Sequence, residues 1–271
     1  MINVAIDGPA GAGKSTIAKA AAKELGFIYV DTGALYRAVA YNAVKNGVID
    51  DEQGIISMLD DTKVELKYVE GVQSVYLNGE DVSGFIRTPE ISMGASKVSA
   101  IPQVREFLLN LQREIAKTNN VIMDGRDIAT VVLPDAEVKI FLFASPECRA
   151  ERRYNELVEK GENVSFDDVL KDVNQRDYQD SHREIAPLKP SEESIMADTS
   201  ELTLQESIDL IVNTIKEKIP TTFFILFSLF FLFSSIFLYF SIASFINTST
   251  FALSFISFSP FNSSDTSTSK K

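Results

Sequence analysis

Residues 8–16, with the sequence GPAGAGKST, combine a glycine-rich backbone with one lysine and two hydroxyl side chains. They match the pattern G-x-x-x-x-G-K-[ST], in which backbone N–H groups turn inward around a phosphate. We therefore predict a nucleotide-phosphate site in which Lys14 reaches the β- and γ-phosphates and the Ser15 hydroxyl ligates Mg²⁺. The predicted nucleotide-binding residues are Gly8, Pro9, Ala10, Gly11, Ala12, Gly13, Lys14, Ser15 and Thr16.

This motif, the P-loop, requires a strand before it and a helix after it, and the flanking sequence predicts both. Residues 2–6 form a short apolar run that is typical of a buried strand. The segment Lys14–Leu25 is rich in alanine and lysine at helical spacing, and Gly26 is suited to end that helix. The N-terminus of the predicted helix would add positive charge to the phosphate site.

A second group of polar residues, Asp124-Gly125-Arg126-Asp127, follows an apolar stretch at 120–124 that we predict to be another buried strand. Open α/β sheets bind ligands at the carboxyl ends of their strands, so these side chains should lie near the phosphate loop. Asp124 is placed to bind Mg²⁺ or its water shell, because carboxylate oxygens are preferred ligands of that ion. The predicted metal ligands are Ser15 and Asp124, the latter directly or through water.

Further arginines and hydroxyl groups follow another predicted strand, at 27–30. In the segment DTGALYR, Tyr36 and Arg37 lie one helical turn beyond Thr32, so all three should lie at the carboxyl end of that strand. A single arginine is more often on a solvated helix face. Several arginines beside a phosphate loop instead favour an anion site.

The segment 176–183, RDYQDSHR, also carries charged residues at helical spacing. Arg176 and Arg183 are seven residues apart, which predicts that they share one helix face with Asp180 between them. His182 is the only histidine, and we assign it to the surface of a mobile loop. For Arg149, Arg152 and Arg153 the sequence leaves open whether they are solvated or lie in a site.

The chain has 271 residues and is acidic, with a formal net charge of −12 at pH 7. Beyond residue 219 only Asp265, Lys270 and Lys271 are charged, so residues 1–219 carry about −13. An acidic surface argues against a nucleic-acid partner, whereas local arginines can still bind a small anion.

Cys148 is the only cysteine, so an intrachain disulfide is excluded and a reducing cytoplasmic location is favoured. We expect no signal peptide, because Asp7 and the glycine loop come too early in the chain. We also expect a monomer, since the predicted helices carry no additional apolar stripe.

Strand and helix patterns alternate along residues 1–219, which predicts an α/β fold with a parallel sheet flanked by helices. The pattern changes at 64–69 and 74–77, where polar and apolar residues alternate, and Asn78-Gly79 is a strong signal for a tight hairpin turn. We predict a small inserted antiparallel unit at about 62–86. The remaining predictions are strands at 138–142 and 194–198 and helices at 34–46, 51–59, 89–98, 102–117, 147–160, 166–177 and 203–218.

Residues 220–271 differ in composition from the rest of the chain. The stretch 223–246 is free of charge and long enough to span a bilayer, with two C-terminal lysines as its only basic flank. Phe and Ser dominate, and the same bias continues through 251–261, where spanning no longer requires it. Two interpretations stay open. One is a membrane anchor. The other, which the composition favours, is T-rich non-coding sequence translated after a lost stop codon or a frameshift.

Five motifs in residues 1–219 together resemble those of the bacterial cytidylate kinases. They are GPAGAGKST, DTGALYR, LNGEDVSGFIRTPEI, DGRDIATVVLPDA and RDYQDSHREIAPL. The resemblance implies a P-loop NTPase-type α/β fold with a helical lid, and the unit at 62–86 looks like the extra sheet of this family. It also implies Mg²⁺-dependent transfer of the γ-phosphate of ATP to CMP or dCMP, a step of pyrimidine metabolism in the cytoplasm.

The resemblance further implies roles for individual residues. Those that would read the cytosine and hold the acceptor's phosphate include Ser96, Arg105 and Asp127, and Asp180 would bind the sugar hydroxyls. The implied catalytic residues are Lys14, Arg126, Arg176 and Arg183. The implied substrate-binding residues are Thr32, Tyr36, Arg37, Ser96, Arg105, Gly125, Arg126, Asp127, Arg176, Asp180 and Arg183.

The same resemblance divides the chain into parts. Residues 1–219 would form the kinase-like domain, with an acceptor-binding insert at about 32–118 and a lid at about 149–187. Residues 220–271 lie outside the resemblance, and any membrane contact would come from 223–246.

Two other functions stay open on the sequence, one within the same class of enzymes and one outside it. One is another P-loop phosphotransferase with a different acceptor, which base preference would distinguish. A GTPase is disfavoured, because the chain has no Asn-Lys-x-Asp motif. The other is a membrane-tethered nucleotide-binding module, which would require a real anchor at 223–246.

Overall fold

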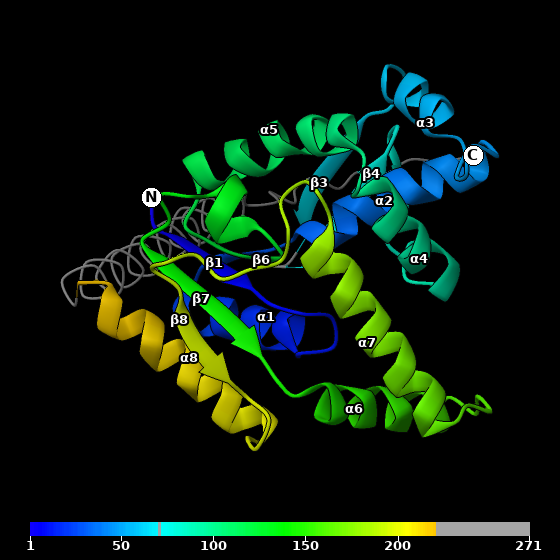
Figure 1. Cartoon of the computed structure of the whole chain (residues 1–271). Helices are drawn as coiled ribbons and strands as arrows, with labels where there is room; N and C mark the ends of the chain where they lie inside the picture. Colours follow the sequence, from blue (N-terminus) through cyan, green and yellow to red (C-terminus); the bar gives the residue numbers. More distant parts are fainter. Residues whose placement is uncertain (70–71, 221–271) are drawn as a thin grey trace, which may run out of the picture. The chain divides into compact units, whose positions relative to one another are not determined.

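The computed structural model describes residues 1–69 and 72–220 (Figure 1). Residues Met1–Ile219 form one compact unit around a five-stranded sheet with the strand order β2-β6-β1-β7-β8. Each neighbouring pair in this sheet is parallel, which confirms the predicted α/β architecture. Its strands are β1 (Asn3–Asp7), β2 (Ile28–Asp31), β6 (Val121–Gly125), β7 (Val138–Phe143) and β8 (Ile195–Asp198).

Helices cover both faces of this sheet (Figure 1). On one face, α5 (Pro102–Thr118) and a π-helical turn, η1 (Ile128–Val132), pack on an apolar cluster that includes Ala5 and Met123 of the strands. On the other face, α1 (Lys14–Leu25) packs against α8 (Leu204–Lys218). Burial of β1, β6 and β7 on both faces explains why these three strands have nearly continuous apolar sequences.

The helix ends follow the capping residues of the sequence. Gly26 ends α1 in the left-handed backbone conformation, with φ of 71° and its N–H donating to the carbonyl of Ala22. Asp31 accepts a hydrogen bond from the backbone N–H of Ala34 and so begins α2 (Thr32–Lys45). Thr203 and Glu206 form a reciprocal capping box at the start of α8. Gly26 and Asp31 therefore fix where α1 ends before β2 and where α2 begins at the end of β2.

The predicted antiparallel unit is present as a three-stranded sheet between α3 (Glu52–Leu59) and α4 (Pro89–Val98). Asn78 and Gly79 both have positive φ, 49° and 87°, as a two-residue hairpin of this kind requires. The unit packs with α2 (Thr32–Lys45) around an apolar cluster separate from the main sheet. Its strands are β3 (Val64–Val69), β4 (Val72–Leu77) and β5 (Glu80–Asp81).

After β7 the chain forms a helical hairpin of α6 (Pro146–Glu159) and α7 (Phe166–His182) (Figure 1). The two helices pack through a small apolar cluster of their own, centred on Ala150, Leu157 and Val169. This hairpin covers most of the segment predicted to be a lid.

Helix α7 is longer than predicted, because the polar sequence after Asp177 continues the helix. The ring of Tyr178 stacks on that of His182, with centroids 4.0 Å apart, and the Ser181 hydroxyl donates to the Asp177 carbonyl. His182 is exposed, as predicted, but it ends a helix and does not lie in a loop. The expectation that Arg183 shares a helix face with Arg176 is also wrong, since Arg183 follows the helix with φ of −64° and ψ of 143°.

The segment 223–246, whose length and composition suggested a membrane anchor or a read-through product, lies outside the described residues. Among the residues that the structure describes, no helix has the length and apolar character needed to cross a bilayer.

Candidate active site

The loop between β1 and α1 folds tightly around its own lysine. At Gly8 a Cβ atom would lie 1.9 Å from the carbonyl oxygen of Leu142 on β7, so only glycine fits there. The Lys14 side chain is buried, and its Nζ donates to the carbonyl oxygen of Pro9 at 2.7 Å. Gly13, with φ of 83°, begins α1 in the left-handed conformation. The N-terminus of α1 therefore faces the space enclosed by the loop.

A cavity of about 540 Å³ extends from this loop across the ends of β2 and β6 to helix α4. Most of the site residues predicted from sequence line it. They are Ala10, Gly11, Gly13, Lys14, Ser15, Thr16, Thr32, Tyr36, Arg37, Ser96, Arg105, Asp124, Gly125, Arg126, Asp127, Arg176, Asp180 and Arg183. The other three predicted residues, Gly8, Pro9 and Ala12, do not line the cavity and belong to the loop itself.

The two predicted metal ligands lie side by side. Ser15 Oγ donates to Asp124 Oδ2 at 2.9 Å, and the hydroxyl of Tyr29 donates to Asp124 Oδ1 at 2.9 Å. Burial and the neighbouring carboxylate of Asp31, its partner in the β2–β6 register, raise the pKa of Asp124. A hydroxyl beside a carboxylate suits a hard cation such as Mg²⁺, whose charge would also relieve this repulsion.

The cavity is locally cationic although the unit around it is acidic. Among the described residues that line it, nine are lysine or arginine and five are aspartate or glutamate. An excess of positive charge within low-dielectric walls attracts anions against the sign of the whole protein. The basic residues are Lys14, Arg37, Arg105, Arg126, Arg149, Arg152, Arg153, Arg176 and Arg183.

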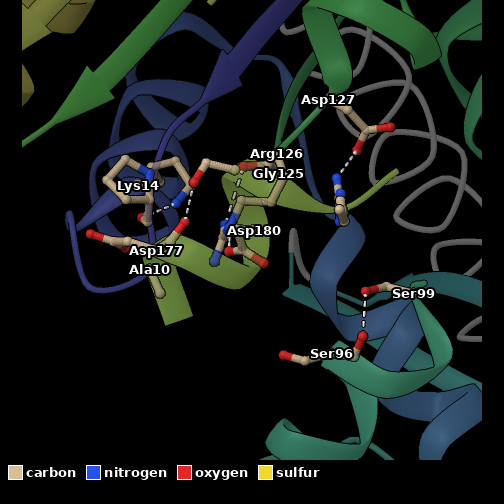
Figure 2. Close-up of polar contacts among 12 residues, drawn as sticks. Ala10, Lys14, Ser96, Ser99, Gly125, Arg126, Asp127, Asp177 and Asp180 are labelled. Atoms are coloured by element: carbon tan, nitrogen blue, oxygen red, sulfur yellow. Dashed lines mark hydrogen bonds and ion pairs between the residues drawn. The ribbon is translucent and has the colours of Figure 1, made fainter. Parts of the chain in front are cut away.

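Carboxylates hold several of these arginines in fixed orientations. Asp180 accepts from Arg126 Nε at 2.8 Å (Figure 2). Asp127 accepts from Arg105 Nη2, and its other oxygen lies 3.6 Å from Arg183 Nη2. Asp127 and Asp180 therefore orient three guanidinium groups along the cavity.

Other donors in the cavity have no hydrogen-bond partner among the described residues. Arg37 Nε and Arg183 Nη2 are buried without a hydrogen bond, and Arg176 makes neither a hydrogen bond nor an ion pair with any described residue. Burial and the nearby charge of Arg126 lower the pKa of Arg176, so an anionic ligand would stabilise its charged form. Buried guanidinium donors of this kind are suited to phosphate oxygens.

The sequence left the position of Arg149 undecided, and the structure places this residue in the site. It is buried, and its guanidinium donates to the carbonyls of Ala144 and Ala10 and forms a two-oxygen ion pair with Asp177 of α7. Its place in the first turn after β7 was the available signal, because that turn lies at the same sheet edge as the phosphate loop. The other lining residues not assigned from sequence are Asp31, Gly33, Ser92, Ala95, Ser99, Arg152, Arg153 and Glu156.

A glycine-rich P-loop on a parallel sheet, beside convergent arginines and a hydrogen-bonded serine–aspartate pair, is typical of the class of P-loop phosphotransferases. Comparison with known proteins is more specific. The family model described as cytidylate kinase matches residues 4–217. The chain belongs to the cytidylate kinase family, and it is an enzyme of the nucleoside monophosphate kinase class.

Individual relatives agree over nearly their whole length. A cytidylate kinase of Lactobacillus johnsonii is 51% identical over 219 residues, which cover 80% of this chain and 95% of the relative. One from Caldicellulosiruptor saccharolyticus is 50% identical over 212 residues, covering 78% and 94%. One from Thermosipho melanesiensis is 49% identical over 215 residues, covering 79% and 97%.

Proposed function

We propose that the protein transfers the γ-phosphate of ATP to CMP or dCMP, giving ADP and CDP or dCDP. The proposal rests mainly on one observation: a single cavity has the phosphate loop on one side and a polar wall on the other. That wall contains Ser96, Arg105 and Asp127, the residues that the family motifs associate with the acceptor. Membership of the cytidylate kinase family supports the choice of acceptor.

The chemistry follows from the charges in the cavity. An oxygen of the acceptor's phosphate attacks the γ-phosphorus, the bond from that phosphorus to the β–γ bridging oxygen breaks, and ADP leaves. The attacking oxygen is already deprotonated near neutral pH, so no general base is required. The protein's contribution is to position the two anions and to neutralise charge that spreads over the transferred group.

We assign the roles within the cavity as follows. Lys14 and the loop N–H groups hold the phosphates of ATP, and Arg126, Arg176 and Arg183 lie between the two ligands. Ser15 and Asp124 would hold Mg²⁺, directly or through water, and the bound ion would neutralise phosphate charge. Thr32, Tyr36, Arg37, Gly125 and Asp180 complete the acceptor site with the residues of the polar wall.

The proposal also covers the parts of the chain. Residues 1–219 carry the activity as a cytoplasmic monomer, with an acceptor-binding insert at about 32–118 and a lid at about 149–187. The separate apolar cluster of α6 and α7 supports a unit able to move over bound ATP and exclude water. The family match ends at residue 217, which supports a dispensable tail at 220–271.

The proposal is tested by ADP release from MgATP with CMP, dCMP, UMP, AMP and GMP offered in turn to the full chain. We expect rapid turnover with CMP and dCMP and much slower turnover with the other three. A chain ending at Ile219 should give the same rates. Turnover with a different acceptor alone would replace the proposal with another nucleotide kinase, and no turnover in a folded protein that binds ATP would favour a binding module.

We further expect MgATP binding at pH 8 to take up protons through Lys14. Burial and then the charge of Arg126 lower the pKa of Lys14 to about 7, so the free protein holds this amine mostly neutral at pH 8. Phosphate oxygens against Nζ favour the charged form and raise the pKa again, so the amine gains a fraction of a proton on binding at this pH. Calorimetric titrations in two buffers of different ionisation enthalpy measure this uptake.

The matched control for the proton uptake is Lys14→Arg, because arginine stays charged in both states. The uptake should disappear in this variant. Equal uptake in the variant and the natural protein would show that another group titrates.

A further inference from the structure

The chain forms the π-helical turn η1 immediately after Asp127, and charged side chains from elsewhere hold both of its ends. At the N-terminal end, Asp7 Oδ1 accepts from the N–H of Ile128 and Asp7 Oδ2 from the N–H of Ala129, both at 2.8 Å. Asp7 ends β1 and is 1% exposed. Both of its oxygens therefore bind the turn that follows Asp127. π-Helical turns are rare and frequently lie at functional sites.

The other end of η1 is held by Arg113 of α5. Arg113 Nε donates to the carbonyl of Val132 at 3.0 Å, and its Nη2 donates to the carbonyl of Val131 at 2.9 Å. Among the described residues Arg113 has no carboxylate partner, so its charge is directed at these two carbonyls. Helix α5 also carries Arg105, whose guanidinium pairs with Asp127.

The turn also fits closely against the cavity wall. A Cβ at Gly125 would lie 2.6 Å from Ile128 Cδ1 and 2.9 Å from Thr32 Oγ1, so η1 packs directly on the end of β6. Between Gly125 and Ile128 stand only Arg126 and Asp127, both of which line the cavity. A displacement of η1 must therefore move these two side chains.

We infer that Asp7 and Arg113 are positioning residues that clamp η1 at its two ends and so orient Arg126 and Asp127 toward the acceptor nucleotide. This inference rests on the proposed function. Neither Asp7 nor Arg113 lines the cavity, so neither side chain is placed to touch a substrate. Both act through the backbone of η1, and the clamp sets the affinity and base selectivity of the acceptor site.

The chemistry of the clamp requires these residue types. Asp7 supplies two acceptors to two N–H groups, whereas asparagine would turn its amide donor toward one of them. Arg113 supplies two parallel donors to two carbonyls, whereas methionine keeps the apolar stem and leaves both carbonyls without this partner. Arg113→Lys retains the positive charge but lacks the two parallel N–H donors of the guanidinium group.

The test compares Arg113→Met, Arg113→Lys and Asp7→Asn in the full chain. The matched control is Lys117→Met, which removes a charge from the same helix where the lysine pairs only with exposed Glu114. We expect Arg113→Met to raise KM for CMP about tenfold, which corresponds to ~1.4 kcal/mol, and to lower the preference for CMP over UMP. KM for ATP should stay within about twofold of the natural value, and Arg113→Lys should show a smaller change of the same kind.

Asp7→Asn should raise KM for CMP in the same way from the opposite end of η1, and Lys117→Met should leave both KM values unchanged. The inference is overturned if the Arg113 variants keep the natural KM for CMP, or if KM for CMP and for ATP rise together. If Arg113→Met does not fold, Arg113→Lys gives the same comparison. If the natural protein itself had no activity on CMP, the proposed function would be refuted. Failure of the proposed function can therefore be distinguished from failure of this inference.

Discussion

Replacing Lys14 by methionine should lower kcat by roughly 10³-fold or more, because a buried cation is lost where charge develops on the transferred phosphate. In the free protein the Lys14 amine has few competing partners, since its Nζ hydrogen bond goes to the Pro9 carbonyl of its own loop. The side chain is buried, so water cannot replace the missing charge effectively. ADP release with saturating CMP and MgATP measures the loss.

The matched control is Lys19→Met, which makes the same change on an exposed position of α1. Its kcat should equal that of the natural protein. The melting temperature of Lys14→Met should not fall, because the substitution removes a desolvated amine from the interior. A Lys14→Met protein with nearly natural turnover would contradict the phosphate-loop assignment.

Local patterns were sufficient to predict the elements that build the sheet. β1, β6 and β7 are buried on both faces, so their apolar runs were visible, and Gly26 and Thr203 marked helix ends through their own conformational preferences. The Asn78-Gly79 hairpin was equally predictable, because few other sequences adopt two successive left-handed residues.

The turn η1 could not be predicted from local preference. Its residues, IATVV, are β-branched apart from one alanine and would suit a strand. They form a π-helical turn because Asp7 and Arg113, which are distant in sequence, satisfy its terminal N–H and carbonyl groups. Long-range hydrogen bonds of this kind leave no signature at the site where they act.

Arginines were the least predictable part of the candidate site. Arg149 and Arg152 lie three residues apart on α6, yet Arg149 is buried against Ala10 and Asp177 whereas Arg152 is exposed. Helical spacing could not separate them, because the difference depends on where α7 packs. The family motifs assigned Arg126, Arg176 and Arg183, and the structure places all three on the cavity.

Replacing Asp127 by asparagine should lower kcat/KM for CMP by roughly 10²- to 10³-fold and raise the ratio of UMP to CMP activity by about 100-fold or more. A carboxylate accepts a hydrogen bond from the exocyclic amine of cytosine, whereas it faces a carbonyl oxygen in uracil. Asparagine can turn its amide N–H toward that oxygen, so the substitution removes the rejection of UMP together with the attraction of CMP. Initial rates with both acceptors at saturating MgATP measure the ratio.

Asp127 also balances charge, since it is paired with Arg105 and lies near Arg183, so loss of its charge weakens acceptor binding of either base. The ratio of the two activities isolates base recognition from this common effect. Asp180→Asn is the matched control, because Asp180 is a carboxylate of the same cavity paired with Arg126 and assigned to the sugar. It should lower both activities alike and leave their ratio unchanged. If Asp127→Asn also lowered both activities by the same factor, Asp127 would orient arginines without reading the base, and selectivity would have to come from Ser96 or Arg105.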